Sequence, residues 1–258
     1  MGAYAPINGL DMYYEEHGQG RPLVLLHGNL STIDVDFGSM IPALARNRRV
    51  IGVEQQAHGH TADIDRPLST HTWAGDTAAL LNHLGVADAD ILGYSTGAAV
   101  ALELAIENPE LVRKLVLFSI AYRADGLHPC ILDGIQQLKP EHLAGTPFEQ
   151  SYAKNAPRPQ DWPVLIEKIK EMDQEVIEWP AETVRAIDKP ALLVIGDSDI
   201  IRPEHAVDMF RLFGGGVAGD VAGLPNSRLA VLPGTTHITL VQRGEWLVPM
   251  IEEFLDGE

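Results

Sequence analysis

Short apolar runs recur along the chain and are separated by longer segments. The runs lie at residues 22–26, 49–53, 89–92, 114–118, 191–195 and 228–232. In the first run polar and apolar residues do not alternate, which is typical of a strand buried on both faces. Strands that alternate with helices form a parallel sheet, so the pattern predicts an α/β fold.

The segments between these runs predict helices. From residue 69 to residue 84, apolar side chains recur at helical spacing, and Ser69 or Thr70 is a suitable N-cap. Other helices are predicted at residues 37–44, 98–106, 203–213 and 240–255.

A hairpin is predicted at the start of the chain. Asn8 and Gly9 join residues 5–7 to residues 10–14, and Asn-Gly favours a two-residue hairpin turn. This antiparallel edge and the six apolar runs make a mostly parallel sheet of eight strands flanked by helices.

The alternation stops after the sixth strand. Residues 122–188 lack convincing buried strands and carry helical segments at residues 131–138, 163–172 and 181–187, spaced by prolines. We interpret them as a helical cap of residues 121–188 on a core domain of residues 1–120 and 189–258. The cap residues expected to face a pocket are apolar: Ile131, Leu138, Trp162, Leu165 and Trp179. For the two tryptophans, simple packing is an equal alternative.

Composition narrows the class of partner. The chain of 258 residues has a formal net charge of -17, which disfavours nucleic acid and anionic membrane surfaces and favours a small neutral molecule. The single cysteine, Cys130, supports neither a disulfide framework nor a thiolate metal cage. With no basic or long apolar segment at the start and no run of membrane-spanning length, we expect a soluble, cytoplasmic protein. The oligomeric state is open.

The strongest chemical signal is Gly93-Tyr94-Ser95-Thr96-Gly97, a G-x-S-x-G motif between a predicted strand and a predicted helix. In that context the central residue occupies a strained turn, and glycine is needed on both sides because no bulky neighbour fits. The turn exposes the Ser95 hydroxyl, and the helix directs N–H groups toward an oxyanion formed there. Ser95 is therefore the predicted nucleophile.

A serine nucleophile needs a base, and the base needs an acid. His237 directly follows the last predicted strand, on the edge of the sheet where Ser95 lies, and a neutral imidazole is a suitable base. Asp199 follows the preceding strand and would orient the imidazole. Asp197 is the competing carboxylate, and Asp199 is favoured because it lies further round the loop.

Two backbone N–H groups are expected to form an oxyanion hole, those of Thr96 and Asn29. Leu30 and Tyr94 lie beside them and are candidate substrate-binding residues, with Trp162 and Trp179 from the cap. His58 and His60 form a His-x-His pair, but no carboxylate or cysteine cluster accompanies them, which favours loop structure over a metal site. No metal and no cofactor are expected.

These motifs together resemble the α/β-hydrolase superfamily, in the group with a helical cap between the sixth and seventh strands. The resemblance rests on His27-Gly28, on a loop at residues 57–61, on the serine motif, on an acid loop at residues 196–199 and on the Pro-Gly-x-x-His pattern at residues 233–237. It covers nearly the whole chain. Many members have methionine after the nucleophile and a third glycine beyond it, where this chain has Thr96 and Ala98.

The resemblance implies a serine hydrolase that cleaves a small to medium apolar ester or lactone through an acyl-enzyme. Serine at position 95 disfavours haloalkane dehalogenase and epoxide hydrolase chemistry, which in similar proteins needs aspartate there. A hydrolase of carbon–carbon bonds with the same three residues remains an alternative. A ligand receptor on the same fold, with slow or absent hydrolysis, is the other alternative.

Overall fold

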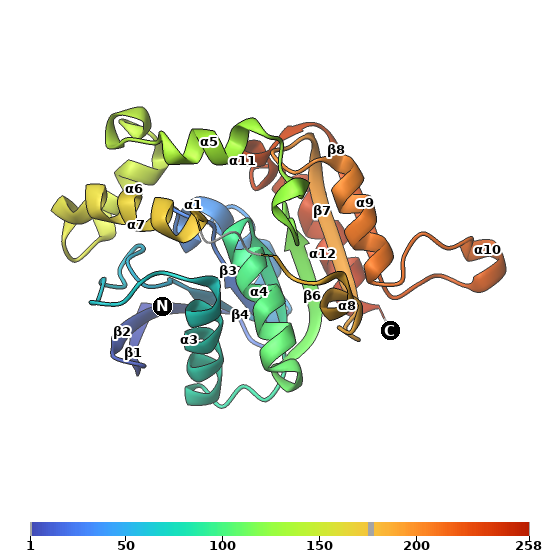
Figure 1. Ribbon diagram of the computed structural model, residues 1–258. Coiled ribbons are helices and arrows are strands. Elements are labelled where there is room, and N and C mark those ends of the chain that lie inside the picture. Colours follow the sequence, from blue (N-terminus) through green and yellow to red (C-terminus); the bar gives the residue numbers. More distant parts are fainter. Residues whose placement is uncertain (1, 175–177, 258) are drawn as a thin grey trace.

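The computed structural model describes residues 2–174 and 178–257. Its eight strands are β1 (Gly2–Ile7), β2 (Leu10–His17), β3 (Arg21–Leu26), β4 (Arg48–Val53), β5 (Ala89–Tyr94), β6 (Val112–Phe118), β7 (Ala191–Ser198) and β8 (Arg228–Thr236). They form one sheet in the order β1-β2-β4-β3-β5-β6-β7-β8 (Figure 1). β2 pairs antiparallel with β1 and β4, and every other pair is parallel. The predicted eight-stranded, mostly parallel α/β sheet is confirmed.

Helices cover both faces of the sheet. They are α1 (Ile33–Phe37), α2 (Ile41–Leu44) and α12 (Gly244–Asp256) on one face, and α3 (Thr70–His83), α4 (Thr96–Glu107) and α9 (Pro203–Leu212) on the other. Val24 of β3 packs into the core under α3 and α4, whereas Leu23 and Leu25 pack into the core under α1 and α12. Since strand side chains alternate between faces, burial on both sides explains the unbroken apolar run at this position.

The predicted helix at residues 37–44 is two short helices, α1 and α2. Pro42 lies in the first turn of α2 and has no N–H group, so it cannot donate to the carbonyl of Gly38 as a continuous helix would require. The chain turns between the helices instead, where the Met40 N–H donates to the Phe37 carbonyl at 2.8 Å.

Among the described residues, four α-helices lie between β6 and β7: α5 (Cys130–Gln136), α6 (Pro147–Asn155), α7 (Trp162–Gln174) and α8 (Ala181–Arg185). Short 3-10 helices also lie there: η2 (Ala124–Gly126), η3 (Pro140–Leu143) and η4 (Pro159–Asp161). The predicted helical segments after the sixth strand are therefore present, whereas residues 175–177 of the predicted cap lie outside the described residues. Figure 1 shows α5, α6 and α7 together across one end of the sheet, and α8 apart from them beside the sheet and α9. Of these four α-helices, α5, α6 and α7 thus cover the end of the sheet, and α8 does not.

A cluster of charges lies at the opposite end of β5. Asp90 is fully buried, and its Oδ2 atom lies 2.6 Å from Arg113 Nη2 and 3.4 Å from Arg48 Nη1. Arg48 also pairs with Asp256, and Arg113 donates to the Leu255 carbonyl at 2.8 Å. These contacts hold the end of α12 against the sheet.

Two short helices complete the chain, α10 (Gly219–Ala222) and α11 (His237–Leu240). Figure 1 shows α10 at the tip of an excursion that projects from the body of the protein between α9 and β8. Among the described residues, none of the helices is long and apolar enough to cross a bilayer.

Candidate active site

Ser95 lies in the turn between β5 and α4. Its backbone has φ 54° and ψ -122°, a conformation that residues with a Cβ atom seldom adopt. A Cβ atom on Gly93 would lie 2.2 Å from the Gly97 carbonyl oxygen, and one on Gly97 would lie 2.0 Å from the Leu26 carbonyl oxygen. Both glycines are required by this packing, which fixes the turn and the direction of the serine side chain.

The structure brings Ser95, His237 and Asp199 together from three strand ends. His237 follows β8, and its Nε2 atom lies 3.0 Å from Ser95 Oγ. Its Nδ1 atom lies 3.0 Å from Asp199 Oδ1, just beyond β7. Tyr94 supports the histidine, because its hydroxyl donates to the His237 carbonyl at 3.0 Å.

Asp199 is buried and heavily hydrogen-bonded. Its Oδ2 atom accepts from Ser119 Oγ at 2.5 Å and from the Gly196 N–H at 3.2 Å, and the Ile201 N–H donates to Oδ1 at 3.3 Å. Burial alone would raise the pKa of Asp199, but the hydrogen bond and charge of His237, with the other donors, lower it below its ordinary value. The carboxylate is therefore ionised beside the imidazole.

Asp197, the competing acid, has another role. Its exposed carboxylate accepts from the Gly234 N–H at 2.9 Å and the Thr235 N–H at 3.2 Å. These two bonds lower its pKa and join the ends of β7 and β8. The geometry thus favours Asp199 as the partner of His237.

Asn29 and Thr96 both line the cavity beside Ser95. Thr96 is the first residue of α4, where an N–H group has no carbonyl partner within the helix. Leu30, next to Asn29, has a positive φ of 61°, and its N–H donates to His58 Nε2 at 3.0 Å. The loop that carries Asn29 is therefore held in a defined conformation.

Three buried residues that hold this loop were not predicted as part of the site. Asp36 Oδ2 accepts from the Gly28 N–H at 2.8 Å. His58 supports Leu30, and His27 Nε2 accepts from the Gln55 N–H at 3.2 Å. No local sequence pattern marks Asp36, because its bond depends on a loop eight residues earlier.

The same burial explains the charge states of these groups. It raises the pKa of Asp36 to about 6, against the hydrogen bonds from Ser31 and Gly28. It lowers the pKa of His58 to about 4 and, with repulsion from His58, that of His27 to about 4. Both histidines are neutral near pH 7, which leaves Nε2 free to accept from the backbone. His58 therefore has a loop-stabilising role, while His60 bonds to Glu54.

A cavity of about 510 Å³ opens at Ser95 and extends under the cap. Leu30 and Tyr94 lie on its wall, as predicted, and so do Ile131 and Leu138. Most of the wall is apolar, with further contributions from Ile135, Leu143, Phe148, Ile169 and Met172. The cap thus supplies much of the surface that a substrate would contact.

Trp162 and Trp179, which were predicted to line the pocket, are not among the residues of its wall, and neither is Leu165. Trp162 packs against Tyr152 with 5.0 Å between ring centroids. Trp179 Nε1 donates to Glu103 Oε2 at 2.7 Å, which turns the ring toward α4. Both tryptophans therefore join parts of the protein rather than face the cavity.

Two charged side chains of the cap lie on the cavity wall. Arg123 donates from Nε and Nη2 to the carboxylate of Asp125, with both distances 3.1 Å. Asp173, near the end of α7, makes no hydrogen bond or ion pair with any described residue. Burial raises its pKa to about 7.

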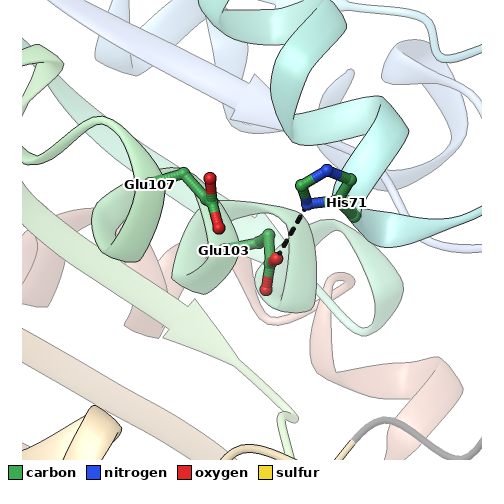
Figure 2. A group of neighbouring side chains, drawn as sticks. All are labelled: His71, Glu103 and Glu107. Carbon is green, nitrogen blue, oxygen red and sulfur yellow. Dashed lines mark hydrogen bonds and ion pairs between the residues drawn. The ribbon is translucent and has the colours of Figure 1, made fainter.

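A possible set of metal ligands lies outside the cavity. Figure 2 shows His71 of α3 and Glu103 of α4 directed toward each other, with Glu107 one turn further along α4. His71 Nδ1 lies 3.2 Å from Glu103 Oε1, and the other oxygen of Glu103 is bound by Trp179. The contacts of Glu103 are explained by an ion pair between α3 and α4 and by attachment of the cap.

Comparisons with known proteins agree with this architecture. Residues 21–134 match a family model described as the alpha/beta hydrolase fold. A non-heme haloperoxidase from Rhodococcus erythropolis is 28% identical over 89% of this chain and 90% of its own length. A meta-cleavage product hydrolase from Pseudomonas fluorescens is 18% identical, covers 98% of this chain and 97% of its own, and superposes with a TM-score of 0.76. An enol-lactonase from Burkholderia xenovorans is 20% identical, covers 98% of this chain and 100% of its own, and has a TM-score of 0.71.

Proposed function

Since this chain is an α/β hydrolase by fold, we propose that it is a serine hydrolase that cleaves a small to medium, largely apolar carboxylic ester or lactone. The observation that carries the proposal is the chain of contacts from Ser95 Oγ to His237 Nε2 and from His237 Nδ1 to Asp199 Oδ1, each 3.0 Å long. Such a chain activates a serine hydroxyl as a nucleophile. The apolar cavity beside it supports a substrate of that size and polarity.

The reaction would begin with attack of Ser95 Oγ on the substrate carbonyl. His237 takes the hydroxyl proton at Nε2, and the ionised Asp199 stabilises the resulting imidazolium through Nδ1–H. The N–H groups of Thr96 and Asn29 stabilise the oxyanion of the tetrahedral intermediate. His237 then returns the proton to the leaving alcohol, and an acyl group remains on Ser95. Water, activated by the same imidazole, hydrolyses the acyl-enzyme.

Turnover of a panel of 4-nitrophenyl esters and lactones by wild type and Ser95→Ala tests the proposal. We expect Ser95→Ala to lose activity by roughly a thousandfold or more, because the hydroxyl is the attacking group. A Ser198→Ala variant, which removes an exposed hydroxyl from the end of β7, is the matched control and should keep wild-type rates. Wild-type activity in folded Ser95→Ala would exclude Ser95 as the nucleophile.

A carbon–carbon bond hydrolase is the second candidate, because a 2-hydroxy-6-oxo-2,4-heptadienoate hydrolase from Pseudomonas putida aligns with the whole chain. The dienoate in that name is an anion. Here Asp173, which is unpaired among the described residues, would repel an anionic substrate when it is ionised, and Arg123 donates to Asp125. Hydrolysis of an ester or lactone is therefore favoured over hydrolysis of a carbon–carbon bond. A substrate panel that also contains a dienoate, and a peroxide with halide, separates ester hydrolysis from carbon–carbon bond hydrolysis and from haloperoxidase activity. A ligand that binds without turnover would indicate a receptor.

A further inference from the structure

We infer that Asp173 is the recognition site for a protonated amine carried at the end of an otherwise apolar substrate. The inference rests on the proposed function and deepens it, since it names the chemical class of the substrate. Asp173 would be a specificity residue that contacts substrate away from the reacting carbonyl.

The position of Asp173 supports this inference. Asp173 belongs to α7 and is one of the residues that line the cavity that contains Ser95. Its neighbours on α7 that share this wall, Ile169 and Met172, are apolar. A group that occupies the cavity would therefore meet one carboxylate in apolar surroundings.

Asp173 also lacks a hydrogen-bonding or ion-pair partner among the described residues. Asp173 is partly buried, and carboxylates that are withdrawn from water are normally paired or hydrogen-bonded, because burial of an unpaired charge is costly. Among residues 2–174 and 178–257, Asp173 has neither a hydrogen bond nor an ion pair. Burial accordingly raises its pKa to about 7. The described part of the chain thus leaves this carboxyl group available to a ligand.

The charged groups around the cavity bear on whether the ligand is a cation or a neutral molecule. The other titratable groups on the cavity wall are Tyr94, Arg123, Cys130 and His237. Arg123 donates to Asp125 and makes no ion pair with Asp173. The net charge of -17 attracts cations at long range. These features favour a cation over a neutral donor.

The experiment uses n-hexylammonium and 1-hexanol, which match in length and differ in charge. Calorimetric titration of the full chain at pH 8 would compare wild type, Asp173→Asn and Asp173→Leu. Because a hydrogen bond to a charged group is stronger than a neutral one, we expect hexylammonium to bind wild type at least about tenfold more tightly than either variant. Binding of 1-hexanol should not change.

The pH dependence gives an independent readout. With a pKa of about 7, Asp173 is mostly ionised at pH 8 and mostly protonated at pH 6, while an alkylammonium stays charged at both values. Wild type should therefore bind hexylammonium up to about tenfold more weakly at pH 6 than at pH 8. In Asp173→Asn this difference should disappear.

Glu171→Gln is the matched control, since it removes one exposed carboxylate from the same helix, two residues away. Equal amine affinity in wild type and Asp173→Asn, or an equal loss in Glu171→Gln, would overturn the inference. An equal loss of 1-hexanol affinity would overturn the assignment of a cation. Failure of the two proposals is distinguishable, because amine binding needs no hydrolysis. Preserved binding without any ester turnover would remove only the proposed function.

For turnover, 4-nitrophenyl 6-aminohexanoate and 4-nitrophenyl heptanoate form the matched pair. Asp173→Asn should lower kcat/KM for the amino ester about tenfold or more, mainly through KM, and should leave the heptanoate rate unchanged or higher. A parallel fall for both esters would contradict a recognition role.

Discussion

Asp197 and Asp199 are two residues apart and lie in different surroundings. Asp199 is buried and contacts the imidazole of His237, whereas Asp197 is exposed and binds two backbone N–H groups of the next strand end. A carboxylate next to an imidazole fixes the tautomer and stabilises the cation formed during proton transfer. A carboxylate bound only to backbone N–H groups contributes to local structure.

We therefore expect Asp199→Asn to lower kcat by roughly 10³- to 10⁴-fold, since the amide would hold the imidazole in the wrong tautomer. Asp197→Asn is its matched control and should lower kcat by less than about tenfold through a small shift of the strand end. Steady-state kinetics on one ester decides between them. Equal losses would transfer the role to Asp197.

At this scale the sequence predicted the residues whose positions follow from strand ends. Ser95, Asp199 and His237 each come just after an apolar run, and parallel strands bring such residues to one edge. Asp36 could not be found in this way, because its bond to Gly28 depends on the path of a loop. The sequence did not show what Trp162 and Trp179 contact either, since a buried aromatic residue of a cap can face the cavity or pack against the rest of the protein.

Among the elements, α7 connects the cavity to the core. One side of it carries Ile169, Met172 and Asp173 of the cavity wall. From another side, Lys168 Nζ donates to Asp63 Oδ2 at 2.6 Å and to the Ile64 carbonyl at 3.2 Å. The position of the cavity wall is therefore coupled to the loop after β4.

Lys168→Met should loosen this attachment. We expect a loss of about 1–2 kcal/mol in the free energy of unfolding and a several-fold rise in KM, because the wall moves when α7 moves. Lys170→Met is the control, since among the described residues the Lys170 side chain pairs with Glu167 on the same helix and with no other carboxylate. Thermal unfolding and kinetics on the heptanoate ester measure both effects. An unchanged KM in Lys168→Met would show that the attachment does not set the wall.

The helices of the cap were predicted with unequal success. Residues 163–172 have strong periodicity and correspond to α7, whereas α6 was missed. Within α6 the large apolar side chains are only Phe148 and Tyr152, so a single pair at helical spacing was the whole signal. A helix with so few apolar residues is stabilised by its tertiary contacts, which no local pattern records.

Across the whole molecule, the candidate active site and the charge cluster around Asp90 occupy opposite ends of the sheet. Asp90 at one end binds Arg48 and Arg113, which in turn hold the end of α12. Burial raises the pKa of Asp90 despite both arginines, so desolvation is large at this position. The ion pairs with Arg48 and Arg113 are needed to offset the desolvation cost of Asp90.

Asp90→Asn should destabilise the protein by about 3–5 kcal/mol, because it removes the buried carboxylate that two largely buried guanidinium groups share, and Asp256 pairs with Arg48 alone of the two. The kcat of the folded fraction should stay at the wild-type value. Asp88→Asn is the control, because its pair with Arg21 is exposed and should contribute less than about 1 kcal/mol. Urea unfolding followed by tryptophan fluorescence measures the difference. A small change in Asp90→Asn would mean that the arginines find other partners.

Strand β5 joins these two regions, with Asp90 near its start and Ser95 just after its end. Five residues of strand span roughly 16 Å. Mutations that far apart usually have additive effects on stability. Substitutions that remodel the cavity for a new substrate, and that weaken the protein as they do so, can therefore be compensated by unrelated substitutions near Asp90. A lineage that carries this fold can change specificity and restore stability in either order, with little epistasis between the two kinds of change.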